Sequence, residues 1–142
     1  MRHVVFRIGA ERYGLPLATV REVVTPGVMS AVPRAPDEFR GIMNLRGRVI
    51  TVVDLAAMLD IQLPTPAEGE PVGKVVILDR GRRDLGLYVT DVDGIHALDG
   101  LAPAPGEALA SIRGVARHPK GAVTVLDADG LDKQVSGLIR SR

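Results

Sequence analysis

Few side chains in this sequence have the type and spacing that catalysis or metal binding requires. The histidines, His3, His96 and His118, lie far apart and form neither an i, i+4 pair nor a group with a carboxylate at metal-site spacing. The serines, Ser111 included, lack the Gly-x-Ser-x-Gly turn of a hydrolase nucleophile. We therefore expect no enzymatic activity and no metal site, and we place the histidines at the surface.

Two patterns resemble ligand loops but fail in detail. The segment Gly69–Lys74 is one residue shorter than a phosphate-binding loop and is followed by valine, where serine or threonine would bind magnesium. Asp91–Gly94 and Asp127–Gly130 begin like calcium loops, but each glycine comes two positions early and no glutamate follows at the twelfth position. We expect no cofactor, and we interpret Asp54 and Asp127 as residues that end a strand and cap the next element, as aspartate does at a helix N-terminus.

The polar segment with the best chemistry for binding is Asn44-Leu45-Arg46-Gly47. Asn44 is the only asparagine of the chain, Gly47 can adopt a positive φ in a tight turn, and the guanidinium of Arg46 can clamp a carboxylate or backbone carbonyls. An ordinary hairpin corner is the alternative. We expect Glu22 to approach Arg46 and to fix this loop against a short helix, the alternative being two independent solvated charges.

The elements that position these residues are mostly short strands. The chain has 16 glycines and 10 prolines, which separate runs of β-branched residues. We expect strands near His3–Ile8, Tyr13–Leu15, Gly41–Asn44, Arg48–Asp54, Lys74–Asp79, Asp84–Thr90, Gly94–Leu98, Ile112–Arg117 and Ala122–Leu126. Helical turns are expected over Leu17–Val23, Leu55–Leu59 and Leu131–Ile139. The predicted class is therefore mainly β.

Composition excludes several classes of function. With 142 residues the chain is the length of one domain, and the absence of cysteine excludes disulfides and thiolate chemistry. A net charge of +1 and an aromatic content of 3% argue against nucleic acid as a partner. The chain has neither an apolar run long enough for membrane insertion nor a signal peptide, so we expect a cytoplasmic protein.

The two halves of the chain resemble each other. A shift of 72 residues places Val4-Val5 on Val76-Ile77, and a shift of 73 places Ile50–Asp54 on Val123–Asp127. Between the halves lies the proline-rich segment Leu63–Pro71. We predict one domain over 1–142 with subdomains of about 1–70 and 71–142. Each would be a small β-barrel, the two packed around a groove, with room for exchange of a strand. The alternative is a chance alignment of β-rich sequences.

The segment Arg40–Leu55 closely resembles the signature of CheW-like coupling proteins of bacterial chemotaxis. The resemblance continues upstream through Phe6–Gly9, Tyr13–Leu17, Val20–Val23 and Val32–Pro36, and more weakly downstream through Lys74–Ile95 and Ile112–Leu131. It therefore covers nearly the whole chain. One departure is Thr51, which stands where the family usually has proline.

The resemblance implies two packed five-stranded SH3-like β-barrels with separate cores, short helices and an adaptor role without catalysis. Its partners would be the regulatory domain of a CheA-type histidine kinase and the helical hairpin tip of a chemoreceptor, a methyl-accepting chemotaxis protein, received in the groove between the barrels. Carried over by position, the partner-binding residues would be Leu17, Val20, Glu22, Val23, Asn44, Leu45, Arg46 and Gly47. The protein would be recruited to membrane receptor arrays, with self-association left open.

Three alternatives remain at this point. The chain could be a small-molecule-sensing β-barrel domain, which would need an enclosed pocket with convergent polar groups. It could be a hydrolase, which would need a nucleophile and a base within hydrogen-bond reach. Leu17 and Val20 could be plain core residues, because an apolar stripe at helical spacing usually faces a core.

Overall fold

The computed structural model describes residues 1–64, 68–69, 72–79, 84–103 and 111–140. The described strands are β1 (Arg2–Ile8), β2 (Glu11–Pro16), β3 (Val20–Val24), β4 (Phe39–Leu45), β5 (Arg48–Asp54), β6 (Lys74–Leu78), β7 (Leu85–Val89), β8 (Asp91–Ala97), β9 (Asp99–Ala102), β10 (Ile112–His118) and β11 (Gly121–Leu126). The helices are the 3-10 turn η1 (Leu17–Thr19), α1 (Leu55–Met58) and α2 (Ala128–Arg140). The prediction of a mainly β fold with short helices is confirmed.

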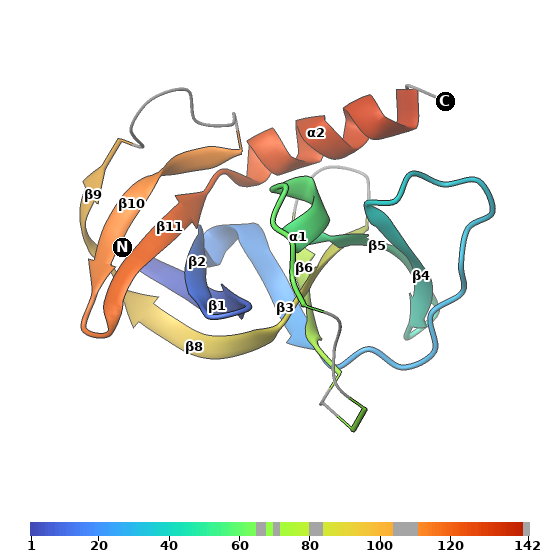
Figure 1. The fold of residues 1–142 in the computed structure, drawn as a ribbon, viewed down its shortest axis with the longest axis horizontal. Helices are drawn as coiled ribbons and strands as arrows, with labels where there is room; N and C mark the ends of the chain where they lie inside the picture. The colour runs from blue at the N-terminus through green and yellow to red at the C-terminus, as the bar shows by residue number, and fades with distance from the viewer. Residues whose placement is uncertain (65–67, 70–71, 80–83, 104–110, 141–142) are drawn as a thin grey trace.

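The strands form two sheets that curl side by side, with α2 lying across the top of both (Figure 1). Among the described residues, sheet A has six strands in the order β8-β1-β2-β11-β10-β9, and sheet B has five in the order β3-β6-β7-β5-β4. The predicted pair of packed barrels is confirmed. Sheet A differs from the expected five strands because β9 adds an exposed edge strand to β10.

The strand register confirms the internal repeat. Val4 pairs with Leu15 on sheet A, and Val76 pairs with Leu87 on sheet B, at positions that differ by 72. The third strand of each half pairs with the first strand of the other half, as β8 with β1 and β3 with β6. The remaining pairs also correspond, because β11–β2 and β5–β7 are both parallel.

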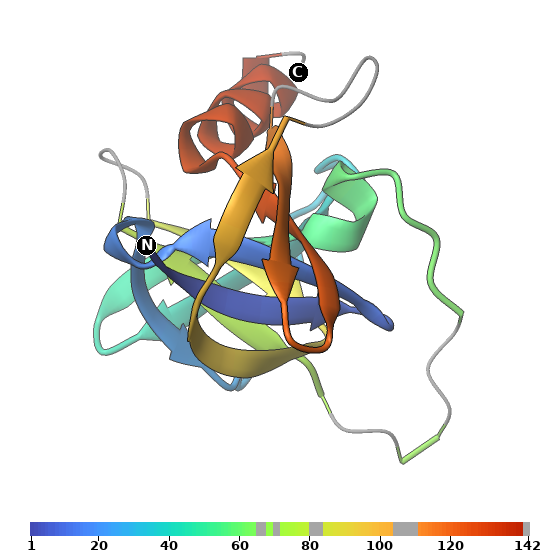
Figure 2. The ribbon, with the colours of Figure 1, turned by 90° about the vertical axis from the view of Figure 1, so that its left-hand side faces the viewer.

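Each sheet draws strands from both halves of the chain. The chain passes from β2 on sheet A to β3 on sheet B through η1, and returns from β7 to β8 through the single residue Thr90. Each half therefore gives its first two strands to the barrel that contains the last strands of the other half. A boundary near residue 70 falls between α1 and β6, and strands from both sides of it are found in each sheet. Figure 2 shows the sheets from the side of β9 and β10.

Among the described residues, three clusters of buried apolar side chains hold this arrangement together. The central cluster lies between the sheets and under the helices, and contains Phe6 and Leu15 from sheet A, Leu87 from sheet B, Leu55 from α1 and Leu131 from α2. A smaller cluster lies within each barrel. The family-based expectation of separate barrel cores therefore needs an addition, because the largest cluster is shared by both barrels.

The sequence-based prediction of a helix over Leu17–Val23 is wrong. Only Leu17–Thr19 forms a helical turn, and Val20–Val24 forms strand β3. The i, i+3 spacing of Val20 and Val23 fits a helix, but β-branched residues also suit a strand, and pairing with β6 decides for the strand. The predicted caps are confirmed: Asp54 accepts a hydrogen bond from the Ala56 N–H at 3.0 Å, and Asp127 accepts one from the Gly130 N–H at 3.1 Å.

Thr51, where the family usually has proline, lies on β5 and contributes to the pairing of β5 with β7. Its N–H donates to the carbonyl oxygen of Asp84 at 2.9 Å. Proline has no N–H and could not make this bond. The departure from the family pattern therefore allows a hydrogen bond from β5 to Asp84, the residue that precedes β7 in the other half of the chain.

Candidate functional site

The β4–β5 hairpin positions the polar segment that the sequence singled out. Its turn consists of Arg46 and Gly47, both with positive φ, 50° and 85°. Two positive φ values suit the right-handed twist of the flanking strands, which is why glycine is favoured in such turns. The Oδ1 atom of Asn44 accepts a hydrogen bond from the Gly47 N–H at 3.0 Å, which stabilises the turn. The expected positive φ of Gly47 is confirmed.

Glu22 and Arg46 form the predicted ion pair. Nη2 of Arg46 donates to Oε1 of Glu22, so the tip of the β4–β5 hairpin is joined to β3. Because β3 and β4 are the two edges of sheet B, this contact bridges the barrel where its edges approach each other. The loop is fixed against a strand and not against a helix, which corrects the expectation. The Arg46 side chain is 68% exposed and remains available to a partner.

The predicted apolar residues differ in their exposure. Leu17 and Val20 are half-buried and pack against the central cluster, so they contribute to the core. Leu45 is also half-buried and packs against the cluster inside barrel B, the barrel formed by sheet B; the barrel formed by sheet A is barrel A. Val23 is 37% exposed and directly follows Glu22 on β3. Of the four, Val23 is the side chain most open to another protein.

A shallow cleft adjoins the predicted site on barrel B. It has a volume of about 280 Å³, and it is lined by Val28, Ser30, Ile42, Met43, Asn44 and Val49. Val28 is 89% exposed and Val49 is 59% exposed. Asn44 is the predicted residue that this cleft reaches.

A second cleft of about 450 Å³ lies between the β1–β2 turn, α1 and β7, and it contains none of the predicted residues. Its polar side chains bind one another or the backbone. Arg40 pairs with Asp54 at 3.5 Å and lies 3.8 Å from the ring centroid of Tyr88. The Tyr88 hydroxyl accepts from the Gly73 N–H at 2.8 Å, and Thr90 Oγ1 accepts from the Gly9 N–H at 2.8 Å. These groups hold the walls of the cleft together, and each of these polar side chains already has a partner.

The histidines are closer together than their separation in the sequence suggests. His3 is buried, which corrects its placement at the surface, and burial lowers its pKa. His3 lies opposite His96 on the neighbouring strand, and the rings of His96 and His118 meet edge to face with centroids 4.6 Å apart. The spacing of the histidines in the sequence gave no sign of this group. The internal repeat offered a signal, because it aligns all three histidines with apolar residues of the other barrel, where a buried position is expected.

The enzyme alternative finds no support in the part of the chain that the structure describes. Ser111 is buried, and its Oγ has no hydrogen-bond partner among the described residues. Within the same residues no group of three or more histidines and carboxylates is arranged to hold a metal ion. The helices described are all too short or too polar to cross a bilayer.

Comparison with known sequences gives a consistent family. The sequence profile of the CheW-like domain matches residues 2–135. A chemotaxis protein CheW from Treponema pallidum is 30% identical over 131 residues, which cover 87% of this chain and 77% of that protein. Relatives from Klebsiella aerogenes, 28% identical over 104 residues, and Rhizobium etli, 32% identical over 92 residues, align with 72% and 65% of this chain. The aligned regions span 61% and 57% of the length of those two relatives.

Comparison with solved structures agrees with the sequence comparison. The crystal structure of the scaffolding protein TtCheW from Thermoanaerobacter tengcongensis superposes with a TM-score of 0.78 and 27% identity, over 89% of this chain and 88% of that one. The profile match covers nearly the whole chain, and the two barrels, the Glu22–Arg46 pair and the strand order all lie within it. The chain therefore belongs to the CheW-like domain family.

Proposed function

We propose that this protein is a non-catalytic signalling adaptor that couples chemoreceptors to a CheA-type histidine kinase. An adaptor acts by binding two partners and holding them at high effective concentration. The family match supports the class, and the names of the relatives and of TtCheW describe chemotaxis and scaffolding proteins. The observation that carries the proposal on this chain is the Glu22–Arg46 pair, which frames an exposed surface without an enclosed site.

The proposed receptor-binding surface consists of β3 and the tip of the β4–β5 hairpin. Val23 offers an exposed apolar side chain, and Arg46 offers a guanidinium that is 68% exposed although it is paired. Asn44 and Gly47 fix the turn that carries Arg46, while Leu17, Val20 and Leu45 support the surface from below. A helical hairpin tip would place an apolar stripe on Val23 and a polar group near Arg46.

The kinase regulatory domain would bind a different face, so that both partners are held at once. Recruitment to membrane receptor arrays would follow from receptor binding, with the adaptor itself in the cytoplasm. Self-association of adaptors within arrays remains a prediction. The alternative of a small-molecule sensor receives no support from the clefts, because the polar side chains described at the 450 Å³ cleft already bind each other or the backbone.

Binding of purified partners tests this proposal. The intact protein is titrated separately with the cytoplasmic fragment of a chemoreceptor and with the regulatory domain of the histidine kinase, both from the source organism. Arg46→Glu and Val23→Asp should weaken receptor binding about 5- to 150-fold, which corresponds to about 1–3 kcal/mol for a lost interface contact, and leave kinase binding unchanged. We prefer Val23 to Val20 because Val20 packs against the core and its substitution would also affect folding.

The matched control is Lys120→Glu. Lys120 lies in the β10–β11 turn, which is the counterpart of the β4–β5 turn in the other barrel, and it is exposed. It carries the same change of charge outside the proposed surface, so receptor binding should be retained. Failure of the unmodified protein to bind either partner would refute the adaptor function. Loss of kinase binding and not receptor binding with Arg46→Glu would refute the assignment of the surface.

A further inference from the structure

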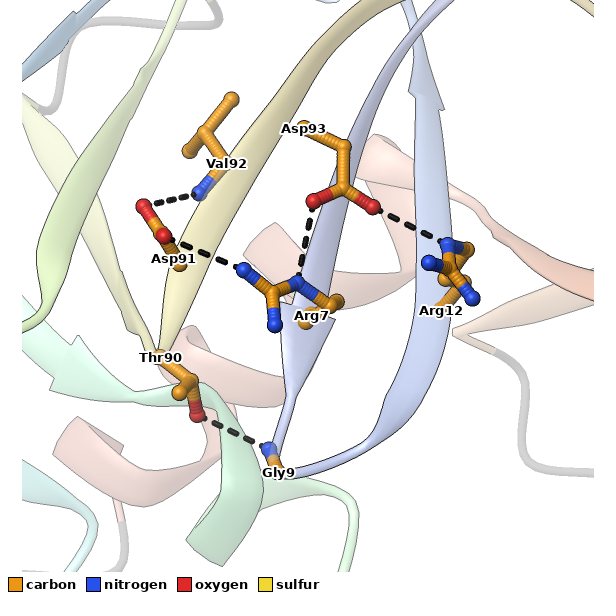
Figure 3. A network of polar contacts seen from close by, with 7 residues as sticks. All are labelled: Arg7, Gly9, Arg12, Thr90, Asp91, Val92 and Asp93. Atoms are coloured by element: carbon orange, nitrogen blue, oxygen red, sulfur yellow. Dashed lines mark hydrogen bonds and ion pairs between the residues drawn. The ribbon is translucent and has the colours of Figure 1, made fainter. Parts of the chain in front are cut away.

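The outer end of the β1–β2 hairpin is held to β8 by a cluster of four charged side chains, here called cluster A (Figure 3). Arg7 pairs with Asp91 at 3.1 Å and with Asp93 at 2.9 Å. Arg12, which lies directly opposite Arg7 on β2, pairs with the other oxygen of Asp93 at 3.0 Å. The arginines belong to the first half of the chain and the aspartates to the second half.

The equivalent cluster on sheet B, cluster B, has the opposite charges. The repeat register places Asp79 and Asp84 at the positions of Arg7 and Arg12, and Arg21 at the position of Asp93. Arg21 lies 3.1 Å from Asp84 and 3.9 Å from Asp79. Here the aspartates lie at the end of the β6–β7 hairpin, which belongs to the second half, and the arginine lies on β3, which belongs to the first half.

Arg48 of the first half strengthens cluster B. Its guanidinium donates to both carboxylate oxygens of Asp84, at 2.6 and 3.2 Å. Its counterpart in the second half is Gly121, which carries no charge. The hydrogen bonds from Arg21 and, secondly, Arg48 lower the pKa of Asp84 below its usual value. Among the residues that the structure describes, the ion pairs of this second-half aspartate are with arginines of the first half.

Short connections prevent each half from closing on itself. If β3 paired with β1 of its own half, it would lie parallel to β2 with β1 between them. The segment that joins the end of β2 to the start of β3 would then have to run back along the whole length of a strand. Three residues span at most about 10 Å, whereas a strand of five or six residues is about 17–20 Å long. Only Leu17–Thr19 joins β2 to β3, and only Thr90 joins β7 to β8. Each hairpin must therefore pair with another half.

We infer that the reversed charges of clusters A and B determine which half each hairpin pairs with. A first half and a second half attract each other, whereas two first halves or two second halves repel each other. Two first halves, from two molecules, would place Arg7 and Arg12 against Arg21. Two second halves would place Asp79 and Asp84 against Asp91 and Asp93. Like charges at these distances repel, whereas a first and a second half give the ion pairs observed. The interface between the halves thus selects a partner of opposite charge, independently of the adaptor function.

Transplanting cluster B onto cluster A tests this inference. The twofold variant, Arg7→Asp with Arg12→Asp, reverses the charges on the hairpin side of cluster A only. The fourfold variant adds Asp91→Thr and Asp93→Arg, which are the residues found at the equivalent positions, Thr19 and Arg21. In urea unfolding of the intact chain, the twofold substitution should lower the midpoint and the fourfold substitution should restore at least half of the loss. A fourfold variant no more stable than the twofold variant would overturn the inference.

Partner choice is measured on the whole protein after cleavage. A protease site is inserted in the segment between Leu63 and Val72, the folded protein is cut, and both pieces are unfolded and refolded together. Native mass spectrometry then distinguishes mixed pairs from like pairs by mass. With the original charges we expect only mixed pairs. In the fourfold variant both halves carry the same charge pattern, so like pairs of both kinds should form alongside mixed pairs.

The control reverses the Glu22–Arg46 pair by Glu22→Arg with Arg46→Glu. Both residues belong to the first half, so their pair stays within one half whichever partner is chosen. This variant should refold into mixed pairs only. Two outcomes would show that charge does not select the partner. One is that like pairs are as abundant as mixed pairs with the original charges, and the other is that like pairs are absent from the fourfold variant.

Discussion

The two barrels share a strand order but differ in the side chains that fill one end of each. In barrel B, Val24 on β3, Val75 on β6 and Leu45 at the end of β4 belong to or pack against the inner cluster. The repeat places His96, His3 and His118 at these positions in barrel A. Even the cross-strand partners correspond, because His3 lies opposite His96 as Val75 lies opposite Val24.

The difference shows that one backbone frame accepts two kinds of chemistry. Barrel B joins its edges with an exposed ion pair above an apolar cluster, whereas barrel A brings the rings of His96 and His118 into contact. Carboxylate and guanidinium keep their charges through the physiological range of pH, but imidazole titrates within it. Any dependence of stability on pH near neutrality should therefore originate in barrel A.

The largest effects are expected where the halves contribute equivalent residues to the shared core. Leu15 and Leu87 occupy equivalent positions, and both are fully buried in the central cluster. Leu15→Ala and Leu87→Ala should each lower the free energy of unfolding by about 2–5 kcal/mol, through lost burial and a cavity. Urea unfolding measures both. A cost that is large for one and negligible for the other would show that the halves are not energetically equivalent.

A second pair of equivalent positions should respond unequally. A Cβ added at Gly86 would lie 2.5 Å from Val75 Cγ1, whereas one added at Gly14 would lie 3.2 Å from Val123 Cγ1. We expect Gly86→Ala to destabilise the protein by about 1–3 kcal/mol through overpacking and Gly14→Ala by less. Thermal unfolding provides the comparison, and Gly86→Ala combined with Val75→Ala should recover part of the loss. The opposite ranking would contradict the packing argument.

The histidines predict a loss of stability in mild acid. Burial lowers the pKa of both His3 and His118, and for His118 the neighbouring His96 acts in the same direction. The unfolded state then takes up protons first, so stability is full above the unfolded pKa of about 6.5 and falls as pH drops through it toward the folded values. The urea midpoint should be lower at pH 5.5 than at pH 7.5.

Replacing the histidines with the residues of barrel B sharpens this prediction. The variant His3→Val, His96→Val, His118→Leu should show a smaller difference between the two midpoints than the original protein. The charges that face His118 include Arg12, Lys120 and Asp93, and all of them are retained. An unchanged pH dependence in this variant would place its origin outside the three histidines.

The smallest effect on stability is expected at the barrel B ion pair. Arg46→Ala removes the contact with Glu22, but the Arg46 side chain is 68% exposed and the pair is screened by water. The free energy of unfolding should fall by about 0.2–1 kcal/mol. Guanidinium chloride would screen the charges further, so urea is the appropriate denaturant. A loss of several kcal/mol would mean that Arg46 supports the fold and not only the surface.

Much of this fold could be predicted from alternation and repeats, and the exceptions have physical causes. Strand β5 is predictable at Arg48–Asp54, where the structure has it, because a run of β-branched residues lies there between two turn signals. Strand β3 is not, because Val20 and Val23 also fit helical spacing. Strand β9 leaves no pattern in the sequence, because Asp99–Ala102 is exposed throughout and has no buried face.

The candidate site was predictable in part. The approach of Glu22 to Arg46 agrees with the chemistry of a guanidinium beside a carboxylate within the family pattern, and the structure bears it out. The exposure of each side chain could not be predicted, because the sequence does not show that Leu17 packs against the central cluster while Val23 faces solvent. Exchange of a strand was an open option in the sequence, but its extent, a whole hairpin from each half, could not be predicted, since the repeat fixes the register and not which half supplies the partner strand.

The two crossings at Leu17–Thr19 and Thr90 have a mechanical consequence. Neither barrel can unfold while the other stays intact, because the central strands of each barrel come from the opposite half of the chain. A force applied to one barrel is therefore transmitted through the main chain and the ladder hydrogen bonds to the other barrel. If the proposed adaptor function is correct, this exchange of strands would keep the two bound partners connected, since a load on one barrel would have to disrupt the other before the protein could separate.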